Sequence, residues 1–175
     1  MKAKFAKVKL LLLDVDGVLT DGMIYLGNDG EVMKVFNARD GLAIKVGLKA
    51  GLDIGLLSGR YSKITENRAS ELGIERIYLG YKNKLSVLEK IINEDKIPSE
   101  CIAFCGDDLI DIPVLRKVGI PVTVSNAAEE VKHVAEYITG RRGGEGAVYE
   151  VIKLILTAKK TWDQAVESFI KDVSD

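Results

Sequence analysis

Acidic and hydroxyl side chains follow three short apolar runs of the sequence. They are Asp14 and Asp16 in LLLDVD, Ser58 in IGLLS, and Asp107, Asp108 and Asp111 in IAFCGDDLID. Ligand crevices of parallel sheets lie beyond the carboxyl ends of the strands. If the three runs are neighbouring parallel strands, these side chains meet in one crevice.

Several carboxylates in one poorly solvated crevice repel each other and cannot all ionise without a cation. Oxygen ligands of this kind suit Mg²⁺, which proteins hold with few carboxylates while water and substrate phosphate complete its shell. The crevice therefore indicates a site for Mg²⁺.

The order Asp14-Val15-Asp16 adds a second chemical signal. In an extended chain the two carboxylates point to the same side and Val15 points to the core. One carboxylate can then attack while its neighbour manages protons, and Gly17 allows the backbone to turn close to a ligand. The pattern Asp-x-Asp-Gly also occurs in plain turns and calcium loops, but its place after an apolar strand, paired with a later GDDLID, favours a catalytic pair.

Lys84 is an unusual residue for its expected position. Asn83 is a candidate N-cap of a helix, which puts the lysine in the first turn, where the helix macrodipole disfavours a cation. The apolar face of that helix is Leu85, Leu88, Ile91 and Ile92. A facing anion would reverse the preference; the alternative is a solvated surface lysine beside Lys82.

The elements that must position these residues are those of an α/β fold. Apolar runs alternate with amphipathic segments, a pattern typical of a right-handed, mostly parallel sheet flanked by helices in three layers. We expect one domain, residues 1–175. A hairpin arm, residues 20–36, is expected around the turn signal at 27–30, and the glycine-rich loop GRRGGEG, residues 140–146, leads into a helical tail, residues 146–172. No insertion is long enough for a large cap domain.

Composition narrows the functional classes. The 175 residues include 25 Lys and Arg against 26 Asp and Glu, a net charge of −1, so no overall field favours nucleic acid or an anionic membrane. No apolar run reaches the roughly 18 residues of a spanning helix, and we expect a cytoplasmic protein. Cys101 and Cys105 fall on one face of an expected strand, where a disulfide is geometrically unfavourable, so both should be reduced core residues.

These residues, in this order, resemble the haloacid dehalogenase superfamily of phosphohydrolases. The motifs that carry the resemblance are DVDGVLTDG, Ser58 in LLSGR, Lys84, and GDDLID. A closer resemblance is to small members without a large cap that act on 3-deoxy-D-manno-octulosonate 8-phosphate. It rests on YLGNDGEVMKVFNARDG, the stretch from SGR to Arg68, and GGEGAVYE, and it covers roughly residues 8–155.

The resemblance implies a role for each strand-end residue. Asp14 would be the nucleophile that forms an aspartyl-phosphate, and Asp16 the acid that protonates the leaving sugar alkoxide and then activates water. Mg²⁺ would be held by Asp14, the backbone carbonyl of Asp16 and Asp107. The residues that support these groups would be Asp108 and Asp111, and those that bind the phosphoryl group Ser58 and Lys84.

The resemblance also implies a role in the synthesis of a lipopolysaccharide precursor, and it implies which residues bind the sugar acid. They are Asp16, Asn37, Ala38, Arg39, Asp40, Gly41, Lys45, Arg60, Arg68 and Lys84. The family commonly has arginine where this chain has Lys45, so a bidentate contact becomes a point charge. Arg68 shares an expected helical face with Ile64 and Leu72, where a guanidinium needs a partner or must reach solvent.

Three expectations concern partners and alternatives. The hairpin arm carries more apolar surface than an isolated ribbon keeps in water, and the resemblance points to a homotetramer in which the arms pack together and help close neighbouring sites. A related nine-carbon sugar-acid phosphate would use the same groups as the expected substrate. A receiver-like signalling module also combines an acidic pocket with a lysine, but it would leave the arm and the glycine-rich loop unexplained.

Overall fold

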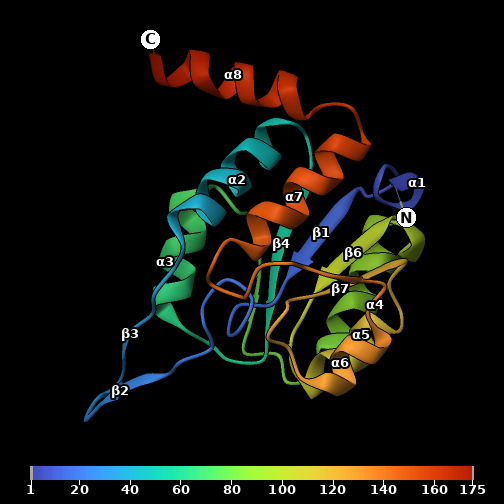
Figure 1. Ribbon diagram of the computed structural model, residues 1–175. Coiled ribbons are helices and arrows are strands. Elements are labelled where there is room, and N and C mark those ends of the chain that lie inside the picture. Colours follow the sequence, from blue (N-terminus) through green and yellow to red (C-terminus); the bar gives the residue numbers. More distant parts are fainter. Residues whose placement is uncertain (1, 175) are drawn as a thin grey trace.

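The structure, a computed structural model, describes residues 2–174 and is built on one six-stranded parallel sheet (Figure 1). The strands follow the order β5-β4-β1-β6-β7-β8 across the sheet. Their bounds are Leu10–Leu13 (β1), Asp53–Ser58 (β4), Arg76–Leu79 (β5), Ile102–Cys105 (β6), Ile120–Thr123 (β7) and Tyr137–Ile138 (β8). Because every neighbouring pair is parallel, all carboxyl ends lie at one edge of the sheet.

Helices cover both faces of the sheet, so the predicted three-layer α/β fold is confirmed (Figure 1). One layer holds α2 (Ala38–Lys49), α3 (Lys63–Leu72) and α7 (Ala147–Ala158); the other holds α4 (Lys84–Asp95), α5 (Ile112–Leu115) and α6 (Glu129–Val134). The predicted helical tail is two helices, α7 and α8 (Trp162–Ser174), and a short α1 (Lys2–Phe5) precedes the sheet. None of the helices within residues 2–174 has the length and apolar content to cross a membrane.

Strand β1 lies at the centre of the hydrophobic core. All four of its leucines are fully buried, since β4 and β6 pair with its two edges and helices cover its faces. Burying one leucine side chain is worth about 1.5–3 kcal/mol. Leu13 lies opposite Leu56 of β4 and Cys105 of β6, and the Asp14 N–H extends the ladder by donating to the Cys105 carbonyl at 2.9 Å. The register therefore places the residues after β1, β4 and β6 side by side.

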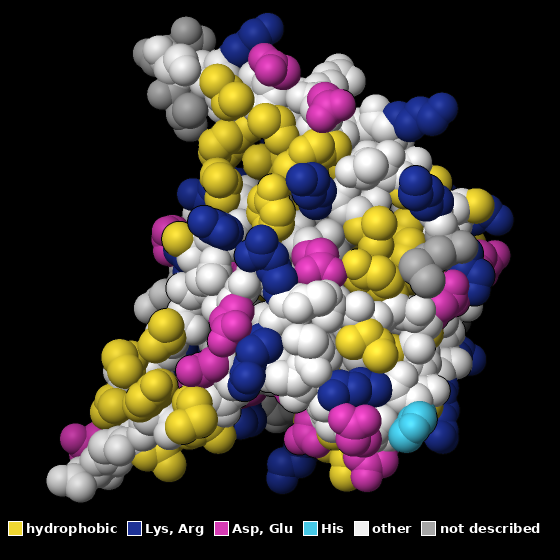
Figure 2. Space-filling model, in the orientation of Figure 1, with side chains coloured by type: hydrophobic (Ala, Val, Ile, Leu, Met, Phe, Trp, Pro, Cys, Tyr) yellow, Lys and Arg dark blue, Asp and Glu magenta, His cyan; other side chains and the backbone are white. Residues whose placement is uncertain are grey.

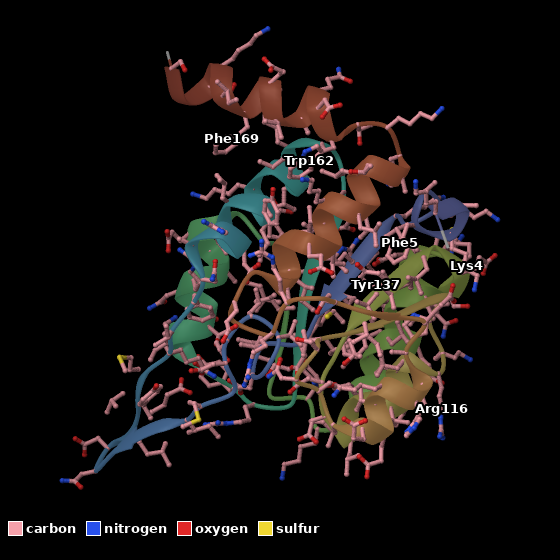
Figure 3. All side chains as sticks on the ribbon, in the orientation of Figure 1. Lys4, Phe5, Arg116, Tyr137, Trp162 and Phe169 are labelled. Atoms are coloured by element: carbon pink, nitrogen blue, oxygen red, sulfur yellow. The ribbon has the colours of Figure 1, made fainter. Side chains whose placement is uncertain are left out.

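Aromatic side chains fasten both ends of the described chain to the sheet and its helices. Phe5 of α1 is buried and meets the Tyr137 ring of β8 edge-on, with ring centroids 5.7 Å apart. Trp162 of α8 meets Tyr149 of α7 in the same way at 5.8 Å. Figure 3 shows Trp162 and Phe169 on the side of α8 that faces α2. Such edge-to-face pairs add to the stabilisation from burial.

The predicted hairpin arm is present between β1 and α2. Strands β2 (Tyr25–Gly27) and β3 (Gly30–Met33) pair antiparallel around the expected turn, and the arm extends away from the sheet (Figure 1). Figure 2 shows hydrophobic side chains gathered along it. The exposed ones are Met23, Ile24, Leu26, Val32, Met33 and Val35. The arm thus presents its apolar residues to solvent.

Two glycines that follow helices adopt the left-handed conformation that ends a helix. Gly51 and Gly73 have φ of 77° and 79°, the left-handed region that glycine adopts without strain. Gly119 is required for a different reason, because a Cβ at this position would overlap the backbone of Glu100.

The cysteine prediction is partly wrong. Cys101 ends the 3-10 turn Ser99–Cys101 instead of lying in β6, and it is half-buried. Cys105 is fully buried in β6, where burial raises the pKa of its thiol well above the usual value. Both thiols are free, as expected.

The glycine-rich loop packs against the β1 loop, residues 14–22. The Gly144 N–H donates to the Val18 carbonyl at 3.0 Å. A Cβ on Gly143 would overlap the carbonyl oxygen of Gly17. Only glycine therefore allows the two backbones to approach this closely, and the glycine-rich loop fixes where the β1 loop lies.

Replacing Gly143 with alanine is expected to lower the free energy of unfolding by about 1–3 kcal/mol, the usual cost of forcing extra atoms into a close-packed site. Gly140→Ala is the matched control, because its Cβ would meet only the Glu150 carboxylate, at 3.7 Å. Urea unfolding of the two variants measures the difference. Equal stability would contradict the close packing of the two loops.

Candidate active site

The carboxyl ends of β1, β4 and β6 open into a cavity of about 410 Å³. The predicted site residues that line it are Asp14, Asp16, Ser58, Arg60, Lys84, Asp107 and Asp108. The lining residues that the sequence did not single out are Gly22, Ile24, Gly59, Lys82 and Ile110. One cavity therefore collects side chains from the ends of three neighbouring strands and from the first turn of α4.

Lys84 is fully buried in the wall of this cavity. Its Nζ lies 2.8 Å from Asp14 Oδ1 and 2.7 Å from Asp111 Oδ1. Asn83 caps α4 by accepting the Ser86 N–H at 3.2 Å, so the lysine does lie in the first helical turn. The two carboxylates outweigh the unfavourable macrodipole. The alternative interpretation of Lys84 as a solvated surface lysine is therefore wrong.

Burial dominates the electrostatics of the cavity carboxyl groups. It raises the pKa of Asp14 to about 7, with a further increase from the charge of Asp111 and an opposing decrease from Lys84. Burial, then the charges of Asp14 and Asp111, raises the pKa of Asp107 to about 8. For Lys84, burial lowers the pKa, but its two carboxylate partners together raise it above the usual value. One buried ammonium therefore does not balance the three carboxylates.

The donor set fits a hard divalent cation. Asp14, Asp107 and Asp111 each place one carboxylate oxygen within 4.8 Å of the others. Asp111 is already engaged, since Oδ1 contacts Lys84 and Oδ2 accepts the N–H groups of Asp107 and Asp108 at 2.9 and 3.2 Å. Asp107 Oδ1 is buried and accepts no hydrogen bond from residues 2–174. The carboxylates best placed to hold Mg²⁺ are therefore Asp14 and Asp107.

The two supporting carboxylates shape the turn after β6. Asp108 accepts the Leu109 N–H at 2.7 Å and forms a capping box with Asp111 at the start of the 3-10 turn Leu109–Asp111. A Cβ on Gly106 would overlap the Asp111 carboxylate, so the chain passes close to that group. The remaining ligand that the resemblance implies, the Asp16 carbonyl, stays a prediction.

Asp16 has a cationic partner that the sequence analysis missed. Lys34, from the hairpin arm, forms an ion pair with Asp16 Oδ1, and Arg60 Nη1 lies 3.9 Å from Asp16 Oδ2. Glu31 of β3 lies 3.3 Å from the ammonium of Lys34 and 3.7 Å from the guanidinium of Arg60. A lone lysine in the apolar stretch VMKVF was the available signal. The arm therefore reaches the active site with polar groups.

Ser58 and Val15 also occupy the places expected of them. Ser58 ends β4, is buried, and accepts the Arg60 N–H at 3.3 Å through its Oγ. Val15 is buried between two cavity-lining aspartates, as the alternation predicts.

Several predicted substrate-binding residues lie elsewhere in the chain. Asn37, Gly41 and Arg68 line a separate, narrow hollow of about 10 Å³. Arg68 stacks near the Phe36 ring at 6.0 Å and pairs with Glu71 at 2.8 Å, which provides the partner that its helical face required. The exposed residues of this group, none of which lines the main cavity, are Ala38, Arg39 and Lys45. Within one chain these residues are not brought to the carboxylate cavity.

Asn37 and Asp40 have structural partners. Asn37 Oδ1 caps α2 by accepting the Arg39 and Asp40 N–H groups, and its Nδ2 donates to the Gly144 carbonyl at 3.2 Å. Asp40 is buried and accepts the Tyr149 N–H of α7 at 2.7 Å. Burial raises the pKa of Asp40 to about 6 despite that bond. Both residues therefore connect α2 to the glycine-rich loop and α7.

Known proteins resemble this chain over nearly its whole length. The haloacid dehalogenase-like hydrolase family matches residues 56–152. The 3-deoxy-D-manno-octulosonate 8-phosphate phosphatase KdsC of Escherichia coli (strain K12) is 44% identical over 163 residues, 93% of this chain and 87% of that protein.

Two solved structures share the fold. The phosphatase of the same name from Moraxella catarrhalis, in complex with a magnesium ion, a phosphate ion and a KDO molecule, has a TM-score of 0.92 and 36% identity, covering 96% of this chain and 97% of that one. The cobalt-bound deoxy-D-mannose-octulosonate 8-phosphate phosphatase from Haemophilus influenzae has a TM-score of 0.88 and 34% identity, covering 91% and 93%. Both structures contain a divalent metal, in agreement with the donor set found here.

The metal-free protein is expected to lose stability as the pH rises from about 4 to about 8. The folded-state pKa values of Asp14 and Asp107, about 7 and about 8, lie above the ordinary 3.8. The folded state therefore holds these protons more tightly, and this stabilisation, complete at low pH, is lost as the pH rises through those values.

Mg²⁺ should reverse the trend, raising the melting temperature more at about pH 8 than at about pH 6, because ionised carboxylates bind it. Thermal unfolding with chelator and with excess Mg²⁺ measures this shift. Asp107→Asn removes a ligand and should lose most of it. An equal Mg²⁺ shift at both pH values would contradict the assignment.

Proposed function

We infer that this chain, which belongs to the 3-deoxy-D-manno-octulosonate 8-phosphate phosphatases within the haloacid dehalogenase-like hydrolases, hydrolyses that phosphate monoester to the free sugar acid and inorganic phosphate. The observation that carries the inference is the 44% identity over 93% of the chain, joined to a cavity in which strand-end carboxylates surround a buried lysine. The reaction supplies a precursor of lipopolysaccharide.

The first half of the reaction forms an aspartyl-phosphate. A carboxylate oxygen of Asp14 attacks phosphorus, and the bond from phosphorus to the sugar oxygen breaks. Asp16 donates a proton to that leaving oxygen, because an alkoxide is a poor leaving group. Ser58 and Lys84 hold the phosphoryl oxygens, which carry the charge of the transition state.

The second half regenerates the enzyme. Asp16, now ionised, takes a proton from water, whose oxygen attacks phosphorus and displaces the carboxylate of Asp14. Mg²⁺ is the cofactor, and it neutralises charge on the phosphoryl oxygens when bound. Asp14 and Asp107 would hold it, while Asp108 and Asp111 keep the turn after β6 in place. Lys84 favours the ionised form of Asp14 and so opposes the effect of burial on that carboxyl group.

The two alternative functions are weaker. A receiver-like module is disfavoured by membership of the hydrolase family and by Asp16, which a phosphate-accepting module does not require. A nine-carbon sugar-acid phosphate presents the same carboxylate and phosphate groups, so it belongs in the same assay.

We further propose a homotetramer in the cytoplasm. Support for assembly comes from the apolar outer surface of the hairpin arm and from the predicted substrate residues on α2 and α3 that lie outside the chain's own cavity. Arms that pack together would bury this surface and bring one subunit's residues towards another's site. Free thiols at Cys101 and Cys105 agree with a reducing compartment.

A phosphate-release assay with Mg²⁺ against a panel of sugar and sugar-acid phosphates tests the function. We expect the highest kcat/KM on 3-deoxy-D-manno-octulosonate 8-phosphate and loss of turnover in Asp14→Asn, with an unchanged fold by circular dichroism. With p-nitrophenyl phosphate, whose leaving group departs without a proton, Asp16→Asn should accumulate phosphorylated Asp14 in intact-mass spectra, because water activation in the second step still needs Asp16. A higher kcat/KM on the nine-carbon ester would make that ester the substrate in place of the eight-carbon one. Turnover by Asp14→Asn would overturn the mechanism.

Replacing Ile24 and Val35 with aspartate should dissociate the tetramer, because charge in an apolar interface is costly to bury. Activity on the sugar acid should then fall far more than activity on p-nitrophenyl phosphate. Light scattering and parallel assays measure both effects. Asp29→Lys, at the tip of the arm, is the control for a charge change alone. A fully active wild-type monomer at assay concentration would contradict the assembly.

A further inference from the structure

A continuous series of polar contacts runs from the active site into the hairpin arm. Asp16 forms an ion pair with Lys34, the Lys34 ammonium lies 3.3 Å from Glu31 Oε1, and the Ser62 Oγ donates to Glu31 Oε2. Ser62 is the N-cap of α3 and is itself buried. The series therefore ends on a rigid helix start.

The burial of Lys34 is the feature that needs an explanation. Its side chain is only 3% exposed. The residues on either side of it in the sequence, Met33 and Val35, are 45% and 50% exposed. A buried ammonium is strongly unfavourable without a hydrogen-bonded ionic partner. Among the residues that the structure describes, its partners are Asp16 and Glu31.

Arg60 does not perform the same task as Lys34. Its guanidinium is 3.9 Å from Asp16, and its side chain is 40% exposed. A partly exposed cation beyond hydrogen-bond distance contributes little to fixing a carboxylate. Lys34 is closer and is held on its other side by Glu31.

We propose that Lys34 is a positioning residue for Asp16, and that Glu31 holds Lys34 in place. This rests on the proposed function, in which Asp16 gives a proton to the leaving oxygen and later takes one from water. Lys34 acts through Asp16 and does not itself contact the reacting atoms. A displacement of about 1 Å in such a group costs on the order of 100-fold in rate.

The proposal makes the effect of Lys34 depend on the leaving group. A sugar alkoxide must be protonated as it departs, so its release needs a well-placed Asp16. Nitrophenolate departs without a proton, so the first step with p-nitrophenyl phosphate does not need one. The second step uses Asp16 with either substrate.

The test compares Lys34→Met with the wild-type enzyme in rapid-mixing experiments with Mg²⁺. Methionine keeps the length of the buried stem and removes the charge. We expect the rate of sugar-acid release to fall on the order of 100-fold, with KM changed by less than about threefold, since general acid catalysis is worth roughly 10²–10⁴. The nitrophenolate burst should change by less than about threefold. Lys34→Arg, which restores a cation, should recover most of the sugar-acid rate.

Two further variants control the comparison. Lys63→Met removes an exposed lysine of α3 whose ionic partner, among residues 2–174, is Glu66, and it should leave all rates unchanged. Glu31→Gln keeps its volume and removes the charge that holds Lys34, so it should show a smaller loss, about tenfold, with the same dependence on the leaving group. If Lys34→Met does not fold, or if light scattering shows that its oligomer has a different mass, Glu31→Gln is used to test the proposal instead.

Equal losses for both leaving groups, or no recovery in Lys34→Arg, would overturn the proposal and leave Lys34 a structural residue. Failure of the substrate assignment is distinguishable from this. If the wild-type enzyme does not hydrolyse the eight-carbon ester but does hydrolyse another alkyl phosphate of the panel, wild type and Lys34→Met are compared with that other ester.

Discussion

The contact of the Lys84 ammonium with Asp14 and Asp111 is the interaction on which the site depends. A parallel sheet aims the ends of β1 and β6 at one point, and carboxylates placed there are pushed together in a poorly solvated cavity. A single buried cation at the start of α4 holds two of them 2.7–2.8 Å away. Asp107 Oδ1 accepts no hydrogen bond from residues 2–174, and the pKa of this carboxyl group is raised to about 8. The cavity carboxylates therefore carry more negative charge than the Lys84 ammonium balances. Mg²⁺ and the other groups that contact the phosphoryl oxygens must supply the missing positive charge.

Close backbone packing keeps this charged cluster in register. Gly17 has φ of 91° and passes so near Asp107 that any side chain would overlap the carboxylate. Gly143 stands against Gly17 from the other side. The β1 loop is thus confined between the turn after β6 and the glycine-rich loop, and this close packing restricts the backbone next to Asp14, the nucleophile of the proposed mechanism. Preorganisation of this kind is what phosphoryl transfer requires, since positioning and charge supply most of the rate enhancement.

The sequence predicted the parts of the site that depend on local pattern. Apolar runs ending in Asp14, Ser58 and Asp107 located three strand ends, and the general rule for parallel sheets brought them together. It could not locate Lys34, because the packing of an arm against the sheet edge depends on contacts between distant segments. Within one chain Asn37 and Arg68 line a separate hollow, so the role in sugar-acid binding that the resemblance implies for them stays a prediction.

An ordinary surface ribbon turns its apolar side chains towards the protein and its polar side chains towards solvent, and the hairpin arm has the reverse arrangement. Glu31 and Lys34 turn towards the active site, whereas the exposed apolar side chains of Leu26, Val32, Met33 and Val35 do not line its cavity. An arm that served only its own chain would gain by burying those apolar residues against the sheet, because apolar burial is the largest favourable term in folding. The arrangement makes sense if both surfaces have partners, the polar one being Asp16 and the apolar one another copy of the arm. Assembly would then hold the arm, the arm would hold Lys34, and Lys34 would hold the proton-carrying carboxylate. In a chain without a large cap, such a series would connect the quaternary structure directly to the chemistry.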